Sequence, residues 1–208
     1  VPHIGNAAGL RDRAMLETLY STGIRRSELA RLKFRDLDFE RGTLMVRQGK
    51  GRKDRMIPIG ERALLWIEAY RDRARPELAV SPDDGTVFLS NWGMAFEPGR
   101  ITDRVRKIVD EADIGKKGAC HLFRHTMATL MLENGADIRF IQAMLGHASL
   151  DTTQIYAQVG IRVLKTVHTA THPGRMPEVG QKPQKDESGP TVDDLLEALA
   201  REAEEGEE

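Results

Sequence analysis

Four short segments of the chain bring arginine, lysine, histidine and tyrosine side chains into otherwise apolar surroundings. The first, T-G-I-R-R-S-E-L, places Arg25 and Arg26 at the junction of two predicted helices. An arginine at such a junction can direct its planar fork toward an oxyanion, assisted by the free amide groups of the following helix start. The alternative is a solvated arginine pair beside a helix N-cap. This segment alone does not decide between the two.

The second segment, Q-G-K-G-R-K-D-R, is a basic turn that contains Lys50, Arg52 and Lys53. Glycines on both sides of Lys50 allow the backbone to approach a partner closely, and a lysine on a turn can neutralise or protonate an oxygen atom. An ordinary solvated turn has the same composition. The segment therefore indicates phosphate chemistry only in combination with the others.

The third segment, H-L-F-R-H, lies near the start of a predicted helix. His121 and Arg124 are three residues apart and share one helix face, so both side chains can reach one phosphate. His121 and His125 are four residues apart, which is the spacing of two metal ligands on a helix. Metalloprotease helices carry a glutamate directly after the first histidine, and Leu122 stands there instead. We therefore predict no metal site.

The fourth segment, L-G-H-A-S-L-D-T-T-Q-I-Y, contains His147 and Tyr156. A buried tyrosine with a partner for its hydroxyl group is the ordinary interpretation. A nucleophilic tyrosine needs cationic neighbours, because a phenol with a pKa of about 10 is mostly neutral at pH 7. The basic residues of the other three segments would supply them.

Hydrophobic periodicity predicts the elements that position these residues. Leucine and methionine spacing predicts a first helix, with Asn6 as its N-cap and Gly23 beyond its end. Alternating apolar residues predict a β-hairpin over 43–59. Further helices are predicted from Ser27 onward and over 61–75 (ending at Pro76), 100–112, 121–133, 138–145 and 152–171. The fold class expected is mainly α with a small antiparallel β-sheet (α+β).

Charge and composition divide the chain into three parts. Residues 1–178 contain 28 Lys and Arg against 22 Asp and Glu, whereas residues 179–208 contain 3 against 10. We expect a folded basic domain over 1–173, a flexible linker rich in Pro, Gly, Gln and Lys over 174–190, and an acidic tail over 191–208 with a possible short helix. The one cysteine excludes an internal disulfide, and no run of roughly 20 apolar residues is present for a membrane span.

Together, and in this order, the four segments resemble the catalytic domain of tyrosine recombinases (integrases), nearest to the Xer-type and integron-type bacterial members. The resemblance extends from about residue 6 to residue 173, including the final segment V-L-K-T-V-H-T-A-T-H-P. It assigns catalytic roles to six residues and DNA contacts to the hairpin turn. The catalytic residues implied are Arg25, Lys50, His121, Arg124, His147 and Tyr156, with Tyr156 as nucleophile, and the implied DNA contacts are Arg52 and Lys53.

The resemblance implies an enzyme that cleaves and rejoins double-stranded DNA through a covalent 3′-phosphotyrosyl intermediate, with neither a metal nor a nucleotide cofactor. It also implies other recombinase protomers in a DNA-bound tetramer, and a bacterial, cytoplasmic and nucleoid-associated protein. Because relatives carry an additional N-terminal DNA-binding domain, we expect an isolated catalytic domain with weak, salt-sensitive DNA binding. The alternatives are a DNA-binding accessory module that does not cut, and an enzyme that relaxes supercoils.

Overall fold

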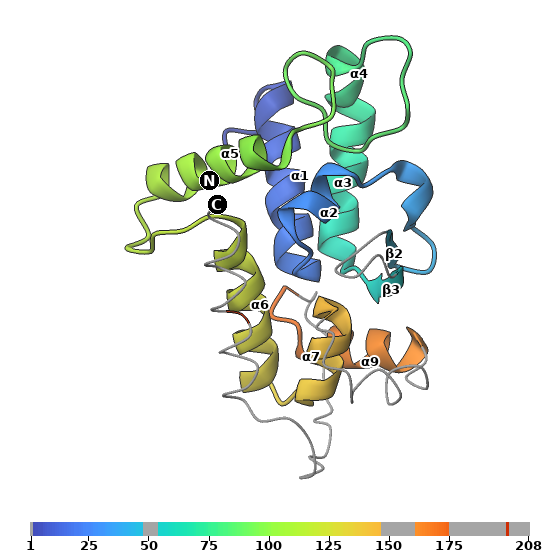
Figure 1. Cartoon of the computed structure of the whole chain (residues 1–208), viewed down its shortest axis with the longest axis vertical. Helices are drawn as coiled ribbons and strands as arrows, with labels where there is room; N and C mark the ends of the chain where they lie inside the picture. Colours follow the sequence, from blue (N-terminus) through green and yellow to red (C-terminus); the bar gives the residue numbers. More distant parts are fainter. Residues whose placement is uncertain (1, 48–53, 147–160, 175–198, 200–208) are drawn as a thin grey trace.

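Helices make up most of the computed structural model, which describes residues 2–47, 54–146, 161–174 and 199 (Figure 1). The described helices are α1 (Ala7–Thr22), α2 (Arg26–Ala30), η1 (Phe34–Asp36, a 3₁₀ turn), α3 (Glu61–Arg73), α4 (Arg75–Leu78), α5 (Pro98–Glu111), α6 (Cys120–Glu133), α7 (Ile138–Leu145) and α9 (Ile161–Thr171). Strands β1 (Leu37–Asp38), β2 (Thr43–Val46) and β3 (Arg55–Pro58) form one antiparallel sheet. The predicted fold class is therefore confirmed. Within the described part of the chain, no helix is long and apolar enough to cross a membrane.

Both ends of α1 lie where local sequence signals place them. At the start, the Asn6 side-chain oxygen accepts a hydrogen bond from the Gly9 amide at 2.8 Å. At the end, Gly23 adopts a left-handed conformation with φ of 61°, and its amide donates to the Leu19 carbonyl at 2.9 Å. The helix therefore stops abruptly, and the chain turns at once into α2.

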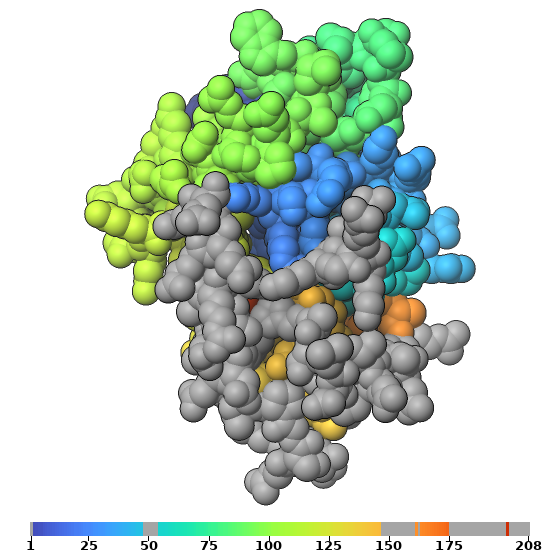
Figure 2. All heavy atoms as spheres, in the orientation of Figure 1, coloured from blue at the N-terminus to red at the C-terminus, as the bar shows by residue number. Residues whose placement is uncertain are grey.

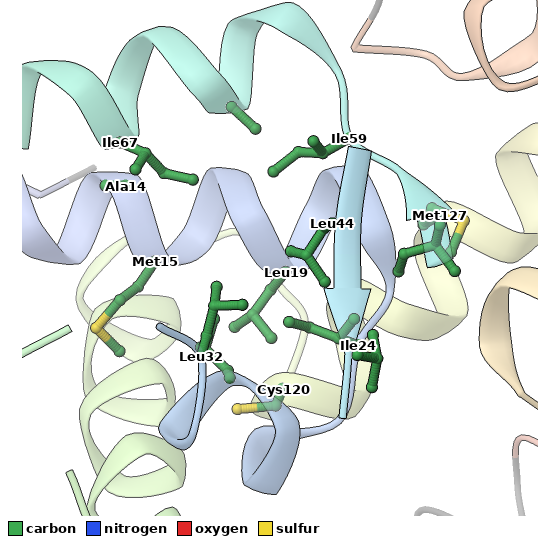
Figure 3. Packing of buried hydrophobic residues seen from close by; sticks show 14 of the residues in the cluster. Ala14, Met15, Leu19, Ile24, Leu32, Leu44, Ile59, Ile67, Cys120 and Met127 are labelled. Atoms are coloured by element: carbon green, nitrogen blue, oxygen red, sulfur yellow. The ribbon is translucent and has the colours of Figure 1, made fainter. Parts of the chain in front are cut away.

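Helix α1 supplies the centre of the hydrophobic core. Ala14, Met15 and Leu19 are at most 1% exposed. Figure 3 shows these side chains in one cluster with Ile67 of α3 and Leu44 of β2. Because α1 packs along α3 and also contacts α6, the core connects the upper and lower parts of Figure 1. This core carries the segments that hold the candidate site.

The predicted hairpin is present, and a third strand extends it. Strand β2 pairs with β3 so that Leu44 lies opposite Ile57, and both side chains are fully buried. The ladder reaches its end at the pair Val46 and Arg55, on either side of the predicted basic turn. Strand β1, which pairs with β2, was not predicted because a strand of two residues shows no alternation. The hairpin turn, residues 48–53, lies outside the described residues.

Pro76 was predicted to mark the end of the helix over 61–75, but it lies in the first turn of a new short helix that begins at Arg75. Helix α3 ends at Arg73, and α4 follows with Pro76 in its first turn, where the missing amide of a proline has no helical partner to lose. The Arg75 guanidinium donates to both carboxylate oxygens of Asp83, at 2.6 and 2.7 Å, and to the Thr86 carbonyl. This ion pair fastens α4 to the loop that follows it.

Helices α6, α7 and α9 form the lower part of the molecule in Figure 1. Helix α9 contacts β3, α6 and α7, and its Leu164 and Val167 side chains are buried. The Asn134 side-chain amide, at the end of α6, donates to the Thr171 carbonyl at 2.8 Å. Helix α9 is therefore an integral part of the fold, and it agrees with the second half of the helix predicted over 152–171. Residues 152–160 lie outside the described residues.

Two stacked histidines attach α9 to the end of α1. The rings of His168 and His172 are 4.5 Å apart between centroids, and their Nε2 atoms lie 2.8 Å from the Ser21 carbonyl oxygen and 2.9 Å from that of Tyr20. Burial lowers the pKa of His168 to about 3 and that of His172 to about 4. Both rings are therefore neutral near pH 7, and each Nε2–H donates to a helix-end carbonyl.

The acidic tail is represented by one residue. Leu199 is helical, is 4% exposed and belongs to the hydrophobic core cluster. It falls within the short helix predicted in the tail. The rest of the predicted tail and all of the predicted linker except Gly174 lie outside the described residues.

Candidate active site

Arg25 is the residue that joins the left-handed turn at Gly23 to helix α2. Helix α2 begins at Arg26, one residue before the predicted start at Ser27, and Arg25 is its N-cap. The side chain of Arg25 is only 16% exposed. In Figure 2 the blue surface around α2 lies between the green surface that includes α5 and the gold surface that includes α7. Arg25 therefore begins a segment that reaches the surface between two other parts of the fold.

Glu28 is the carboxylate that orients this segment. Its side chain is 2% exposed, and its oxygens accept from the Arg25 amide at 2.9 Å and from the Arg25 guanidinium at 3.4 Å. Arg55 donates two further hydrogen bonds to the same carboxylate, each 2.9 Å long. Burial raises the pKa of Glu28, but the hydrogen bonds and charges of Arg55 and Arg25 outweigh it and lower that pKa overall. Glu28 is therefore a buried anion held by two arginines.

Arg124 is the largest fully buried side chain among the described residues, at 1% exposure. From α6, its guanidinium donates to the Gly23 carbonyl and, at 2.9 Å, to the Leu145 carbonyl. The Gly23 carbonyl directly follows α1, and the Leu145 carbonyl belongs to the last residue of α7. Unpaired carbonyls at helix ends carry partial negative charge. A Cβ atom on Gly23 would lie 2.3 Å from the Met127 Cε atom. Glycine therefore allows α6 to approach closely enough for Arg124 to bind this turn.

The C-terminal end of α7 is held by two arginines that come from different elements. The Met144 carbonyl accepts from Arg55 Nε at 2.9 Å, and the next carbonyl, that of Leu145, accepts from Arg124. Gly146 ends the helix in the predicted place, with φ of 68°. The position of the chain just before His147 is therefore determined by the same arginines that border the Arg25 segment.

His121 lies in the first turn of α6, one helical turn before Arg124, and is half-buried. The two predicted partners therefore come from one helix, as their spacing indicated. His125, the alternative metal partner of His121, is exposed, and the described residues contain no cluster of three or more His, Cys, Asp or Glu side chains suited to a metal. Burial raises the pKa of the neighbouring Cys120 thiol to about 11. The thiol therefore stays protonated and does not compete as a nucleophile.

The structure brings three of the eight predicted site residues into one region and describes no others. Arg25 is linked through Glu28 and Arg55 to the Met144 carbonyl, Arg124 binds the next carbonyl, and His121 lies on the helix that carries Arg124. The other five predicted residues lie outside the described residues; they are Lys50, Arg52, Lys53, His147 and Tyr156. Their catalytic or DNA-binding assignments stay predictions.

Glu28 and Arg55 are the members of the network that sequence reasoning missed. The sequence contains one signal for each: Glu28 follows Arg25 by three residues and so lies on the same helix face, and Arg55 lies two residues before the buried Ile57, on the same face of β3. Neither signal indicates that the two side chains meet, since 27 residues separate them. The pairing is a tertiary contact between β3 and α2.

The charge balance of this network suits an anion. Arg25 and Arg55 both bind the carboxylate of Glu28, whereas Arg124 binds the backbone carbonyls of Gly23 and Leu145, so these four side chains together carry an excess of positive charge. Arginine remains charged at all relevant pH values, and its fork matches the geometry of phosphate oxygens. The arrangement can therefore attract and orient a phosphodiester next to the start of α2.

Comparison with known sequences shows that the chain belongs to the phage integrase family. Residues 2–161 match the sequence model of the phage integrase family. The chain is 52% identical over 168 residues to tyrosine recombinase XerC 2 of Ralstonia nicotianae, covering 81% of this chain and 48% of that protein. It is 40% identical over 172 residues to tyrosine recombinase XerD of Pseudomonas putida, covering 83% of this chain and 57% of that protein. The chain thus spans about half the length of these curated relatives.

Solved structures give the same result for the fold. The crystal structure of XerA recombinase is similar with a TM-score of 0.63 and 38% identity, covering 80% of this chain and 60% of that one. The XerH site-specific recombinase bound to its difH substrate, in a pre-cleavage complex, is similar with a TM-score of 0.61 and 26% identity, covering 75% and 45%. The fold of the described helices and sheet is therefore similar to that of the XerA and XerH recombinases.

Proposed function

Because the chain belongs to the phage integrase family, we propose that it is the catalytic domain of a site-specific recombinase that cleaves and rejoins double-stranded DNA through a 3′-phosphotyrosyl intermediate. The observation that carries this proposal is that Arg124 binds the carbonyl of Gly23, two residues before Arg25, while Arg25 is held by Glu28. Further support comes from the names of the relatives, which are tyrosine recombinases, and from the DNA-bound state of XerH.

In the proposed cleavage step, the Tyr156 phenolic oxygen attacks a backbone phosphorus and the bond from phosphorus to the 5′-oxygen breaks. The products are a phosphotyrosyl bond to the 3′ side and a free 5′-hydroxyl. Arg25 and Arg124 hold the two non-bridging oxygens, on which negative charge accumulates in the transition state. Attack by a 5′-hydroxyl from a partner strand reverses the step. One phosphodiester replaces another of similar energy, so the reaction needs no nucleotide cofactor.

Three further residues move or hold protons in this scheme. Lys50, on the hairpin turn that β2 and β3 support, donates a proton to the departing 5′-oxygen. His121, at the start of α6, accepts the Tyr156 proton. His147, which directly follows the α7 end held by Arg55 and Arg124, donates a hydrogen bond to a phosphate oxygen.

The proposed partners follow from the same chemistry. Arg52 and Lys53, on the hairpin turn, neutralise backbone phosphates of double-stranded DNA, so binding weakens as salt concentration rises. Exchange between two duplexes requires four strand cleavages, which a tetramer of protomers supplies. A protein with this substrate acts at the bacterial nucleoid in the cytoplasm. Within the chain, residues 1–173 form the catalytic domain, 174–190 a linker and 191–208 an acidic tail.

A trapping experiment tests the proposal against a DNA-binding module that does not cut. Duplexes with randomised sequence and a bridging 5′-phosphorothiolate are incubated with the chain, because the thiolate that leaves is a poor nucleophile for the reverse step. We expect an adduct that survives denaturation and disappears on protease treatment, and we expect Tyr156→Phe to bind DNA without forming it. An adduct that persists in Tyr156→Phe, or no adduct with the unmodified chain, would refute the proposal.

A further inference from the structure

Arg55 lies at the base of the hairpin, where three segments of the candidate site meet. It is the first residue of β3, paired with Val46 across the end of the ladder, and its side chain is 14% exposed. The hairpin turn that contains Lys50 begins and ends within a few residues of this pair. Arg55 is therefore part of the hairpin by its backbone and part of the interior by its side chain.

The side chain of Arg55 makes three hydrogen bonds in two directions. Two of its nitrogens donate to the two oxygens of Glu28, and its third donates to the Met144 carbonyl, all at 2.9 Å. This bidentate pairing with an additional carbonyl uses the planar fork of arginine, and the point charge of a lysine cannot reproduce it. Arg55 therefore fixes α2 and α7 relative to β3.

The contact with α7 is close. A Cβ atom at Gly146 would lie 2.9 Å from Arg55 Cζ and 3.0 Å from Arg55 Nε. The guanidinium thus packs against the last residue before His147. Because Arg124 binds the carbonyl of Leu145 and Arg55 that of Met144, two consecutive carbonyls at this helix end are each held by an arginine.

We propose that Arg55 is a positioning residue for DNA cleavage: its guanidinium holds Glu28, and through Glu28 the backbone and guanidinium of Arg25, together with the end of α7, in the arrangement that the scissile phosphate requires. This inference rests on the proposed function. Arg55 acts through Glu28 and the Met144 carbonyl, whereas Arg25 and Arg124 are proposed to bind the phosphate oxygens themselves.

Arg55 also affects the protonation of Glu28. Glu28 is almost completely buried, and the hydrogen bonds and charge of Arg55 are the main reason that its pKa lies below the ordinary value. Without this guanidinium, burial raises the pKa of Glu28, and the carboxyl group becomes protonated as pH falls. Protonated Glu28 accepts the Arg25 hydrogen bonds less strongly, so the position of Arg25 then depends on pH.

The chain contains a matched control for this arrangement. Arg75 is also buried, also donates to both oxygens of a carboxylate, that of Asp83, and also binds a backbone carbonyl, that of Thr86. It is the first residue of α4 and binds Asp83 and Thr86, whereas Arg55 binds Glu28 and Met144. Arg75→Lys therefore removes the same type of interaction without touching the candidate site.

The experiment compares Arg55→Lys with Arg75→Lys in the full chain. The substrate is a single 5′-phosphorothiolate duplex, chosen from the sequences that the unmodified chain traps. We expect Arg55→Lys to form the covalent adduct about 10- to 100-fold more slowly at saturating protein, with DNA affinity unchanged. We expect Arg75→Lys to shift the unfolding midpoint to a similar extent and to cleave at the unmodified rate. Equal cleavage rates in the two variants would overturn the proposal.

A pH profile separates positioning from a general loss of stability. In Arg55→Met, the rise of the adduct rate with pH that accompanies ionisation of Glu28 should move to higher pH than in the unmodified chain, and Glu28→Gln added to this variant should abolish that rise. A profile that matches the unmodified chain would overturn the proposal. If Arg55→Met does not fold, the rates of Arg55→Lys decide. Failure of the unmodified chain to form a Tyr156-dependent adduct would refute the proposed function instead, so the two failures are distinguishable.

Discussion

Replacing Gly23 by alanine tests how the turn before Arg25 supports the site. The residue has φ of 61°, which costs a residue with a Cβ atom about 1–2 kcal/mol. The new Cβ would lie 2.3 Å from the Met127 Cε atom and 2.9 Å from a Leu145 methyl group, and both neighbours are fully buried. Overpacking of this kind costs about 1–3 kcal/mol. We therefore expect Gly23→Ala to lower the free energy of unfolding by about 2–5 kcal/mol.

Gly85→Ala provides the control, because Gly85 also has a left-handed φ, of 79°, but a Cβ atom there would meet nothing within 4 Å. We expect this variant to lose only the backbone contribution of about 1–2 kcal/mol. Urea denaturation followed by circular dichroism gives both values, with equal m-values for a two-state transition. Equal losses in the two variants would refute the close packing of α1, α6 and α7 around the turn.

Gly23→Ala should also affect the proposed reaction, because the Gly23 carbonyl is a partner of Arg124. Under conditions in which the variant is folded, displacement of α6 by the new methyl group moves Arg124 away from Arg25. We expect slower adduct formation than in Gly85→Ala at the same temperature. Equal rates would show that the turn contributes to stability alone.

Three other predictions concern the rest of the chain. Burial lowers the pKa of His168 to about 3 and of His172 to about 4, so both residues bind protons in the unfolded chain, and not in the folded one, as pH falls below about 6.5. The free energy of unfolding should therefore be about 3 kcal/mol lower at about pH 5.5 than at about pH 8. A flat profile by urea denaturation would contradict this. Lys50→Ala should strongly slow the cleavage of ordinary DNA. It should slow the cleavage of a 5′-phosphorothiolate substrate only a little, because a thiolate leaves without a proton. Equal slowing on the two substrates would show that Lys50 only positions the substrate. Deleting residues 200–208, which contain 1 Arg against 5 Glu and leave the buried Leu199 in place, should strengthen DNA binding at low salt in a gel-shift assay. Unchanged binding would show that these residues do not repel DNA.

Local signals predicted most of the fold. The ends of α1 at Asn6 and Gly23 and the end of α7 at Gly146 depend on a few consecutive residues, so the sequence pattern was sufficient. Pro76 was misinterpreted because a proline ends a helix and also favours the first turn of the next one. The sequence pattern around Pro76 is compatible with both, so it does not decide between them.

The candidate site was predicted only in part, for the same reason. Arg25, His121 and Arg124 were identifiable by residue type, spacing and resemblance. The pairing of Glu28 with Arg55 and the binding of Arg124 to the Gly23 and Leu145 carbonyls join residues that are distant in the sequence. No periodicity within one segment reports such contacts, so they become visible only once the sheet, α2, α6 and α7 are packed together.

Peptide mapping of the DNA adduct tests the central claim most directly. The trapped complex is digested with nuclease and protease, and mass spectrometry locates the residue that retains a nucleotide. We predict one modified peptide, with a 3′-phosphate ester on the phenolic oxygen of Tyr156. A nucleotide on any other residue would contradict the account of how this chain acts on DNA.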